Sequence, residues 1–117
     1  MYKLIRSLLP VVAALLAAAA GAQNAAWTGT AELLGENAYR IVLEASIPQP
    51  YHMYDMGPYE DGPNATSIVF TPGEGVTLEG GVEQLDTPHR YFDELFGMEI
   101  GTFSGKARFA QRVKLSV

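Results

Sequence analysis

The chain has 117 residues, contains no cysteine and carries a formal net charge of −5 at pH 7. The lack of cysteine excludes disulfide bonds, on which small exported domains often depend, and excludes thiol chemistry by this chain's own side chains. The acidic balance argues against nucleic acid as a partner, and the length limits the chain to one domain with a modest core.

Residues 1–22 have the pattern of a bacterial secretory signal peptide. A basic start precedes an apolar run at residues 11–20, and the small residues Ala20 and Ala22 stand at −3 and −1 of a cleavage site. A transmembrane anchor needs about 20 apolar residues, and this run is shorter. We therefore expect cleavage after about Ala22 and export to the periplasm. The mature domain, residues 23–117, then keeps 13 acidic and 6 basic side chains, a net charge of −7.

Beyond this leader the chain alternates like an all-β protein. A first strand is expected over residues 27–34. Residues 38–47 place apolar side chains on one face and mostly polar side chains on the other, which is the period of two of a half-buried strand. The intervening residues 35–37 tolerate positive φ, so a hairpin is predicted. The two prolines in residues 48–50 end the second strand.

The middle of the chain is rich in turn residues. Residues 55–66 are predicted to form a loop, residues 67–71 a short strand, and residues 76–78 an extended segment. A second long loop is expected over about 83–97, and another strand over 99–103.

The segment 106–117 has the clearest alternation. Phe109 and Val113 share the face predicted to enter the core, and Ala110 lies on the opposite face with the cations. Four of the six cations of the mature chain fall in this segment. They form either an anion-binding strip or a solvated strand face whose charges prevent edge pairing.

About six strands at short spacing, with Gly- and Pro-rich turns and no amphipathic helix, predict an all-β fold of the immunoglobulin-like sandwich class. Such a sandwich usually has about seven strands or more in about 100 residues, and the alternation is still running at Val117. We therefore expect the sandwich to lack its last strands. The final strand, left unpaired at an edge, is expected to promote association.

Motifs for catalysis or metal binding are lacking. The sequence contains no GxSxG, no Gly-rich phosphate loop and no HExxH. With two histidines, His52 and His89, and no cysteine, the available ligands predict no metal site, and no cofactor is expected. Asp93 and Glu94 are adjacent, but neighbours on a strand point to opposite sides. Aromatic residues in or beside the two loops form either packed lids, contact surfaces or ordinary core. They are Tyr51, Tyr54, Tyr59, Tyr91, Phe92 and Phe96.

Two stretches of the sequence match a known family: residues 50–54, PYHMY, and residues 92–100, FDELFGMEI, which are followed by a strand ending in residues 109–113. They resemble the N-terminal periplasmic domain of DsbD-type thiol:disulfide interchange proteins. The first stretch is similar to an aromatic segment of that domain, and the second to its cap loop and next strands. The turn 62–66, GPNAT, also fits. The resemblance covers roughly residues 27 to 117.

The resemblance implies an immunoglobulin-like domain that receives reducing equivalents from a DsbD-type membrane domain. Such a domain passes them to periplasmic thiol-disulfide proteins, such as disulfide isomerases and cytochrome c maturation thioredoxins. A cap loop shields its redox cysteine pair, and Leu95 stands where an aromatic is common in that loop. The residues that match the cap loop are Asp93, Glu94, Leu95 and Phe96. Those that match aromatics near the cysteine pair are Tyr51 and Tyr54.

The family's two cysteines lie after the strand that corresponds to residues 106–117, so its redox activity does not carry over to this chain. We expect the chain to supply scaffold, cap loop and partner surface, and to be inactive alone, because disulfide exchange requires a thiolate. The alternative is a non-enzymatic periplasmic binding or adhesion module built on the same sandwich, since a fold does not determine function.

Overall fold

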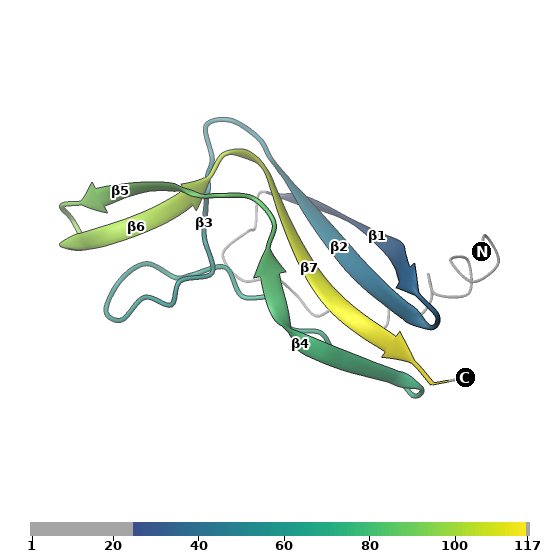
Figure 1. The fold of residues 1–117 in the computed structure, drawn as a ribbon. Helices are drawn as coiled ribbons and strands as arrows, with labels where there is room; N and C mark the ends of the chain where they lie inside the picture. Colours follow the sequence, from purple (N-terminus) through teal and green to yellow (C-terminus); the bar gives the residue numbers. More distant parts are fainter. Residues whose placement is uncertain (1–24, 117) are drawn as a thin grey trace.

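The computed structural model describes residues 25–116, and within that range every regular element is a β-strand. The strands form two antiparallel sheets, a longer one in the order β1-β2-β7-β4 and a shorter one in the order β3-β6-β5. Figure 1 shows the β5–β6 hairpin extending beyond one end of the longer sheet. The all-β prediction is confirmed. The strands are β1 (Ala26–Gly35), β2 (Ala38–Ile47), β3 (Met53–Tyr54), β4 (Val76–Gln84), β5 (His89–Asp93), β6 (Met98–Phe103) and β7 (Gly105–Leu115).

The first hairpin forms where the sequence predicts it. β1 and β2 pair antiparallel, and the predicted strands 27–34 and 38–47 differ from the observed ones by only one residue at each end of the first. Asn37 in the turn adopts a φ of 57°. Asparagine tolerates this left-handed conformation because its short polar side chain hydrogen-bonds locally.

The core lies on one face of the longer sheet, around its two central strands. Leu43 of β2 lies opposite Phe109 of β7, and Phe109 is fully buried. The ring of Phe109 packs edge-on against Phe103, with centroids 5.8 Å apart, and its centroid lies 6.0 Å from that of Trp27. The buried side chains of β2 occur at every second residue, as the sequence pattern predicts. They are Tyr39, Ile41, Leu43, Ala45 and Ile47.

One polar side chain enters this core and holds the edge strand β4. Gln111 is 2% exposed, and its amide nitrogen donates to the carbonyls of Glu79 and Gly80 at 3.2 and 3.1 Å. The pairing of β4 with β7 shifts between Glu79 and Glu83. Gln111 therefore supplies donors where the bulge interrupts the ladder, so that these carbonyls keep partners.

The last strand lies inside the sheet, so the prediction that it leaves an unpaired edge is wrong. β7 pairs with β2 on one side and with β4 on the other. Phe109 and Val113 are buried on the core face, as predicted. Ala110, which the alternation places with the exposed cations, is also buried, at 1% exposure. Its burial follows from its central position, because Val42 and Glu83 flank it from the two neighbouring strands.

The middle of the chain differs from prediction in two places. Residues 67–71 are not a strand, and they form only isolated bridges. Ile68 and Phe70 are nevertheless buried in the core cluster, so this segment contributes apolar side chains without joining a ladder. The long loop expected over 83–97 is instead the end of β4, a short connection, β5 and a turn.

The shortest connection between the two sheets runs from β6 to β7. β6 ends in the shorter sheet and β7 begins in the longer one, with only Ser104 between them. The bend is tight, because the amide of Lys106 donates to the carbonyl of Ser104 at 2.9 Å. Gly105 has a φ of 77°, a conformation that glycine adopts without a steric penalty.

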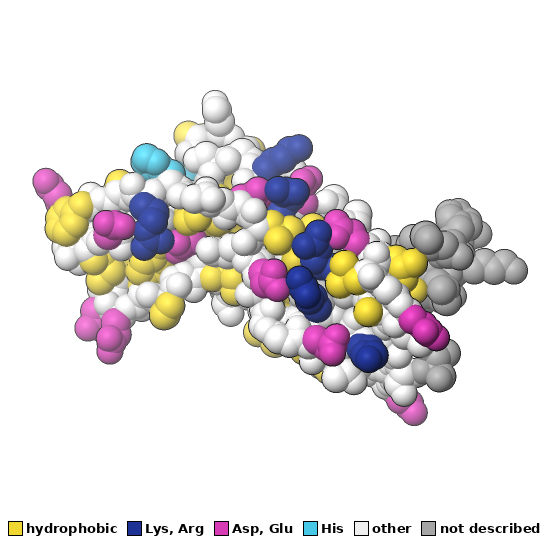
Figure 2. Space-filling model, in the orientation of Figure 1, with side chains coloured by type: hydrophobic (Ala, Val, Ile, Leu, Met, Phe, Trp, Pro, Cys, Tyr) yellow, Lys and Arg dark blue, Asp and Glu magenta, His cyan; other side chains and the backbone are white. Residues whose placement is uncertain are grey.

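The cations of β7 lie on the outer face of the longer sheet. Arg108 forms an ion pair with Asp86 at 2.9 Å, and Arg112 lies 3.7 Å from Glu83. Figure 2 shows Lys and Arg side chains interleaved with Asp and Glu on the face that it presents. This arrangement favours the solvated strand face over the anion-binding strip, because two of these cations already face carboxylates.

Candidate functional site

The β5–β6 hairpin carries the residues that match the cap loop. Residues 94–97 form the turn between the two strands. Asp93 closes this turn twice: its Oδ1 accepts from the amide of Phe96 at 3.1 Å, and its carbonyl accepts from the amide of Gly97 at 2.8 Å. Glu94 is exposed in the turn. Asp93 therefore shapes the turn, and nothing pairs it with Glu94 as an acid and base.

The tip of this hairpin exposes apolar side chains. Leu95 is 88% exposed and Phe92 is 64% exposed. Figure 2 shows hydrophobic side chains beside acidic ones at the end of the molecule that the hairpin forms. The hairpin therefore exposes apolar surface beside acidic side chains, and a bound partner would remove that surface from water.

A hollow of about 420 Å³ lies between the hairpin turn and the loop 55–66. Tyr54 reaches it from β3, and Phe96 reaches it from the turn. The two stretches that carry the family resemblance therefore meet at one place, although they lie far apart in the sequence. The residues that line the hollow are Tyr54, Gly62, Pro63, Asn64 and Phe96.

The structure does not bring all of the predicted aromatic residues to this hollow. Tyr51 precedes β3, is 51% exposed and does not line it. His52 is exposed, and its ring lies edge-on to that of Tyr54, with centroids 6.4 Å apart. Of the two aromatic residues inferred from the resemblance, only Tyr54 therefore lies with Phe96.

A buried carboxylate attaches the loop to the hairpin. Asp55 is 3% exposed, and its Oδ1 accepts from the Tyr59 hydroxyl at 2.5 Å and from the Gly57 amide at 3.1 Å. Its Oδ2 lies 3.3 Å from Nη1 of Arg90 on β5. Both oxygens thus have donors, as a buried charge requires. We call Asp55, Tyr59 and Arg90 the clasp.

Tyr59 also completes the edge of β6. β3 pairs with only two residues of β6. Beyond them, the Asp55 amide donates to the Gly101 carbonyl at 3.0 Å, and the Tyr59 hydroxyl accepts from the Gly101 amide at 2.7 Å. A side chain thus stands in for the next strand residue, and the Gly101 amide keeps a partner. A Cβ at position 101 would collide with the Asp55 carboxylate, so glycine is needed for this close approach.

Within the clasp, the negative charge of Asp55 is paired with the positive charge of Arg90. Burial and the hydrogen bond to Asp55 raise the pKa of Tyr59 above its ordinary 10.0, so the phenol remains a neutral donor at neutral pH. The Glu99 carboxylate, 3.0 Å from Nε of Arg90, raises the pKa of Arg90, and Asp55 adds to this effect. A carboxylate, a neutral phenol and a permanent cation make a structural connection, and the clasp itself contains no activated nucleophile.

Sequence reasoning missed the clasp. Asp55 and Tyr59 fall in a segment whose Gly and Pro content predicts a loop, where polar residues are common. One signal was present: Met53 is apolar, and Asp55 lies two residues later on the same side of an extended chain, so a carboxylate occupies an inward position. Nothing in the sequence marks Arg90 as its partner.

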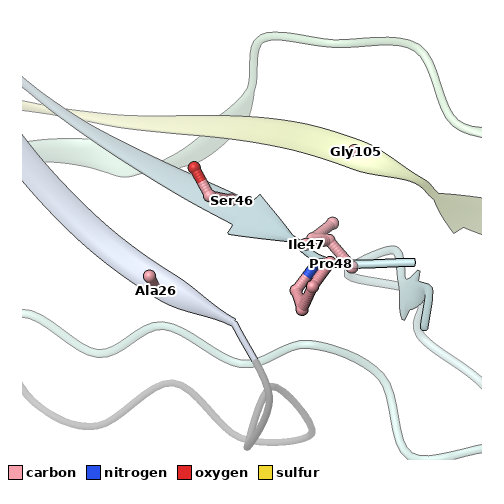
Figure 3. Close-up of a pocket in the computed structure, with 5 residues that line it drawn as sticks. All are labelled: Ala26, Ser46, Ile47, Pro48 and Gly105. Carbon is pink, nitrogen blue, oxygen red and sulfur yellow. The ribbon is translucent and has the colours of Figure 1, made fainter. Parts of the chain in front are cut away.

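A smaller hollow, of about 300 Å³, lies at one end of the longer sheet. Figure 3 shows that it is bounded by the start of β1, the end of β2 and the start of β7. Its lining contains no titratable side chain, so it offers no acid, base or metal ligand. The lining residues are Ala26, Ser46, Ile47, Pro48 and Gly105.

Residues 25–116 contain no group of three or more His, Cys, Asp or Glu side chains placed to hold a metal ion. In the same range, no helix is long and apolar enough to cross a membrane.

Comparisons with known proteins give no relative: no family model, no curated protein and no solved structure matches the chain.

Proposed function

We propose that this chain is the exported scaffold and cap-loop part of a DsbD-type thiol:disulfide interchange domain. The observation that carries the proposal is the convergence of Tyr54 and Phe96 on one hollow, beside a turn that exposes Leu95. In the family that the sequence resembles, the corresponding turn shields a redox cysteine pair. The chain contains no cysteine, so its own part is to shield and to bind, and not to exchange disulfides.

The order of strands in the longer sheet supports an immunoglobulin-like sandwich. One sheet of such a sandwich has its strands in the order A-B-E-D. The observed order β1-β2-β7-β4 is the same if β4 corresponds to strand D and β7 to strand E. The β5–β6 hairpin is then an insertion between these two strands. The insertion is then the hairpin that carries the cap-loop residues.

A binding titration tests the proposal. The processed, ¹⁵N-labelled protein is titrated with a periplasmic disulfide isomerase and, separately, with a cytochrome c maturation thioredoxin, and amide shifts are followed by NMR. We expect shifts at residues 94–97 and around Tyr54, and none at the β1–β2 turn. Leu95→Ala should weaken binding, whereas Leu34→Ala, the same change at an exposed leucine of β1, should not.

The titration also separates the two candidate functions. The chain alone should reduce no insulin disulfides, because it has no thiolate. Binding of neither protein, or shifts confined to other surfaces, would overturn the proposal and favour the non-enzymatic binding or adhesion module.

Export to the periplasm is part of the same proposal. Residues 1–22, which carry the predicted signal peptide, lie outside the described residues. The intact mass of protein recovered from an exporting host should correspond to a chain beginning at Gln23. A mass that retains residues 1–22 would contradict the predicted cleavage.

A further inference from the structure

The two sheets of the described chain have four edge strands, and three of them are short or interrupted. β3 has two residues and β5 has five, and β4 is interrupted by its bulge between Glu79 and Glu83. β1 has ten residues, without proline or lysine. Its one charged residue, Glu32, is engaged by Arg40 of its own neighbour β2 at 2.6 Å. Short length, bulges, prolines and lysines protect edges from pairing with other chains, and β1 has none of these over residues 26–33.

The open side of β1 offers both hydrogen bonds and apolar surface. In an antiparallel pair, every second residue turns its N–H and C=O away from the neighbouring strand. On the core face of β1, Trp27, Ala31 and Leu33 are only partly buried. A strand added beside β1 would pair these backbone groups and cover these side chains.

β1 is complementary to itself in one antiparallel register, with Gly29 opposite Gly29 of a second copy. Trp27 then lies opposite Ala31 of the copy, so the largest side chain of the core face meets a small one. Thr28 lies opposite Thr30 of the copy on the outer face, and such cross-strand threonine pairs stabilise sheets. The two-fold axis repeats each pair, as an isologous interface requires.

The same register keeps like charges apart, because Glu32 lies opposite the uncharged Ala26 of the copy. We propose that β1 is a homodimerisation edge, through which two copies join their four-stranded sheets into one continuous sheet. An edge contact covers few side chains, so the dimer is weak and forms with increasing protein concentration. The proposal is independent of the thiol:disulfide function.

Sedimentation equilibrium of the processed protein tests the dimer, and two double variants test the register. Thr28→Lys with Thr30→Lys places lysine opposite lysine of the copy at both symmetric pairs. Thr28→Lys with Thr30→Glu places lysine opposite glutamate at the same positions. We expect the first variant to dissociate at least about tenfold more readily than the second. Circular dichroism and thermal unfolding verify that both variants fold.

A single introduced thiol gives an independent test, because the chain has no cysteine of its own. Gly29→Cys places the two sulfurs of the dimer at the axis, where opposite Cα atoms are about 4.5–5.5 Å apart, within disulfide range. We expect rapid oxidation to a covalent dimer. Thr77→Cys, an exposed position on the other edge strand, should oxidise far more slowly.

A monomer at every concentration, equal dissociation of the two double variants, or equal oxidation of the two cysteine variants would each overturn the proposal. Binding to thiol-disulfide proteins in the titration above would be unaffected by any of these outcomes.

Discussion

The longer sheet and the loop-and-hairpin region are stabilised by different means. In the sheet, β2 and β7 bury apolar side chains such as Leu43 and Phe109 in register. In the loop-and-hairpin region, a buried carboxylate, Asp55, is held by a phenol and by an arginine. The first region depends on apolar burial, which is non-directional. The second depends on hydrogen bonds, which need each partner in place.

This difference predicts how far the effect of a substitution extends in each of the two regions. Loss of apolar burial in the sheet lowers the stability of the whole molecule, because the central strands contact both neighbouring strands. Loss of a polar partner in the clasp frees a local segment, because the bonds of the clasp join one loop to one hairpin. Global unfolding and local opening are therefore separable by experiment.

The largest expected effect is in the sheet. Phe109→Ala removes a fully buried ring and should lower the free energy of unfolding by about 3–5 kcal/mol. Phe92→Ala, the same change at a mostly exposed ring, should change it by less than about 0.5 kcal/mol. Denaturant unfolding of both variants measures the difference. A loss at Phe109 as small as that at Phe92 would mean that Phe109 does not face the core, as in a β7 shifted by one residue.

The next effect is in the clasp. Asp55→Ala leaves the Tyr59 hydroxyl and the Gly57 amide without their acceptor, which should cost about 1–3 kcal/mol. Amide exchange should become faster in residues 57–66 and should stay slow in β2. Glu60→Ala, at an exposed position in the same loop, serves as the control. Equal acceleration in β2 would contradict a local role for the clasp.

A smaller effect concerns the ion pair between Asp86 and Arg108. The hydrogen bond from the Arg108 side chain holds the pKa of Asp86 below its usual 3.8. The folded pKa is thus lower than the unfolded one, so the stabilisation is present above the unfolded value and is lost as pH falls through the folded value. Asp86→Asn should destabilise the protein at pH 7 by up to about 1 kcal/mol. In acid, below the lowered pKa, the variant and the parent should unfold alike in urea. A difference in unfolding free energy that persists in acid would mean that the effect comes from packing and not from the ion pair.

The smallest effect is at the hairpin tip. Leu95→Ala should leave the unfolding free energy unchanged within about 0.5 kcal/mol, because the side chain is exposed. In the parent protein, the amides of Glu94 and Leu95 should exchange faster than those of Ile41 and Leu43. Protection at the tip equal to that of β2 would count against a cap that opens.

The sequence predicts the strands that follow the simplest rule. β2 and β7 show apolar alternation with a period of two, and turn residues mark the boundary between β1 and β2. Residues 67–71 bury Ile68 and Phe70 at alternate positions, as a strand does, yet their backbone forms only isolated bridges. Alternation reports which side chains face the core, and it does not report whether the backbone is paired.

The parts that could not be predicted depend on contacts between distant residues. β5 reads His-Arg-Tyr-Phe-Asp, and its Phe92 is exposed, so the strand lacks the usual apolar pattern. The clasp joins Asp55 to Arg90, 35 positions later, and no local pattern specifies that pair. Of the candidate site, the sequence therefore located Tyr54 and the turn at 93–97, and it missed the polar connection that holds them together.

The single residue between β6 and β7 has a mechanical consequence. Because only Ser104 separates the two strands, no flexible linker lies between the hairpin and the central strand β7 of the longer sheet. The clasp ties the other side of the hairpin to the loop. We therefore expect a partner that binds at Leu95 to shift the amide signals at the start of β7 together with those of the hairpin, because only one residue separates them.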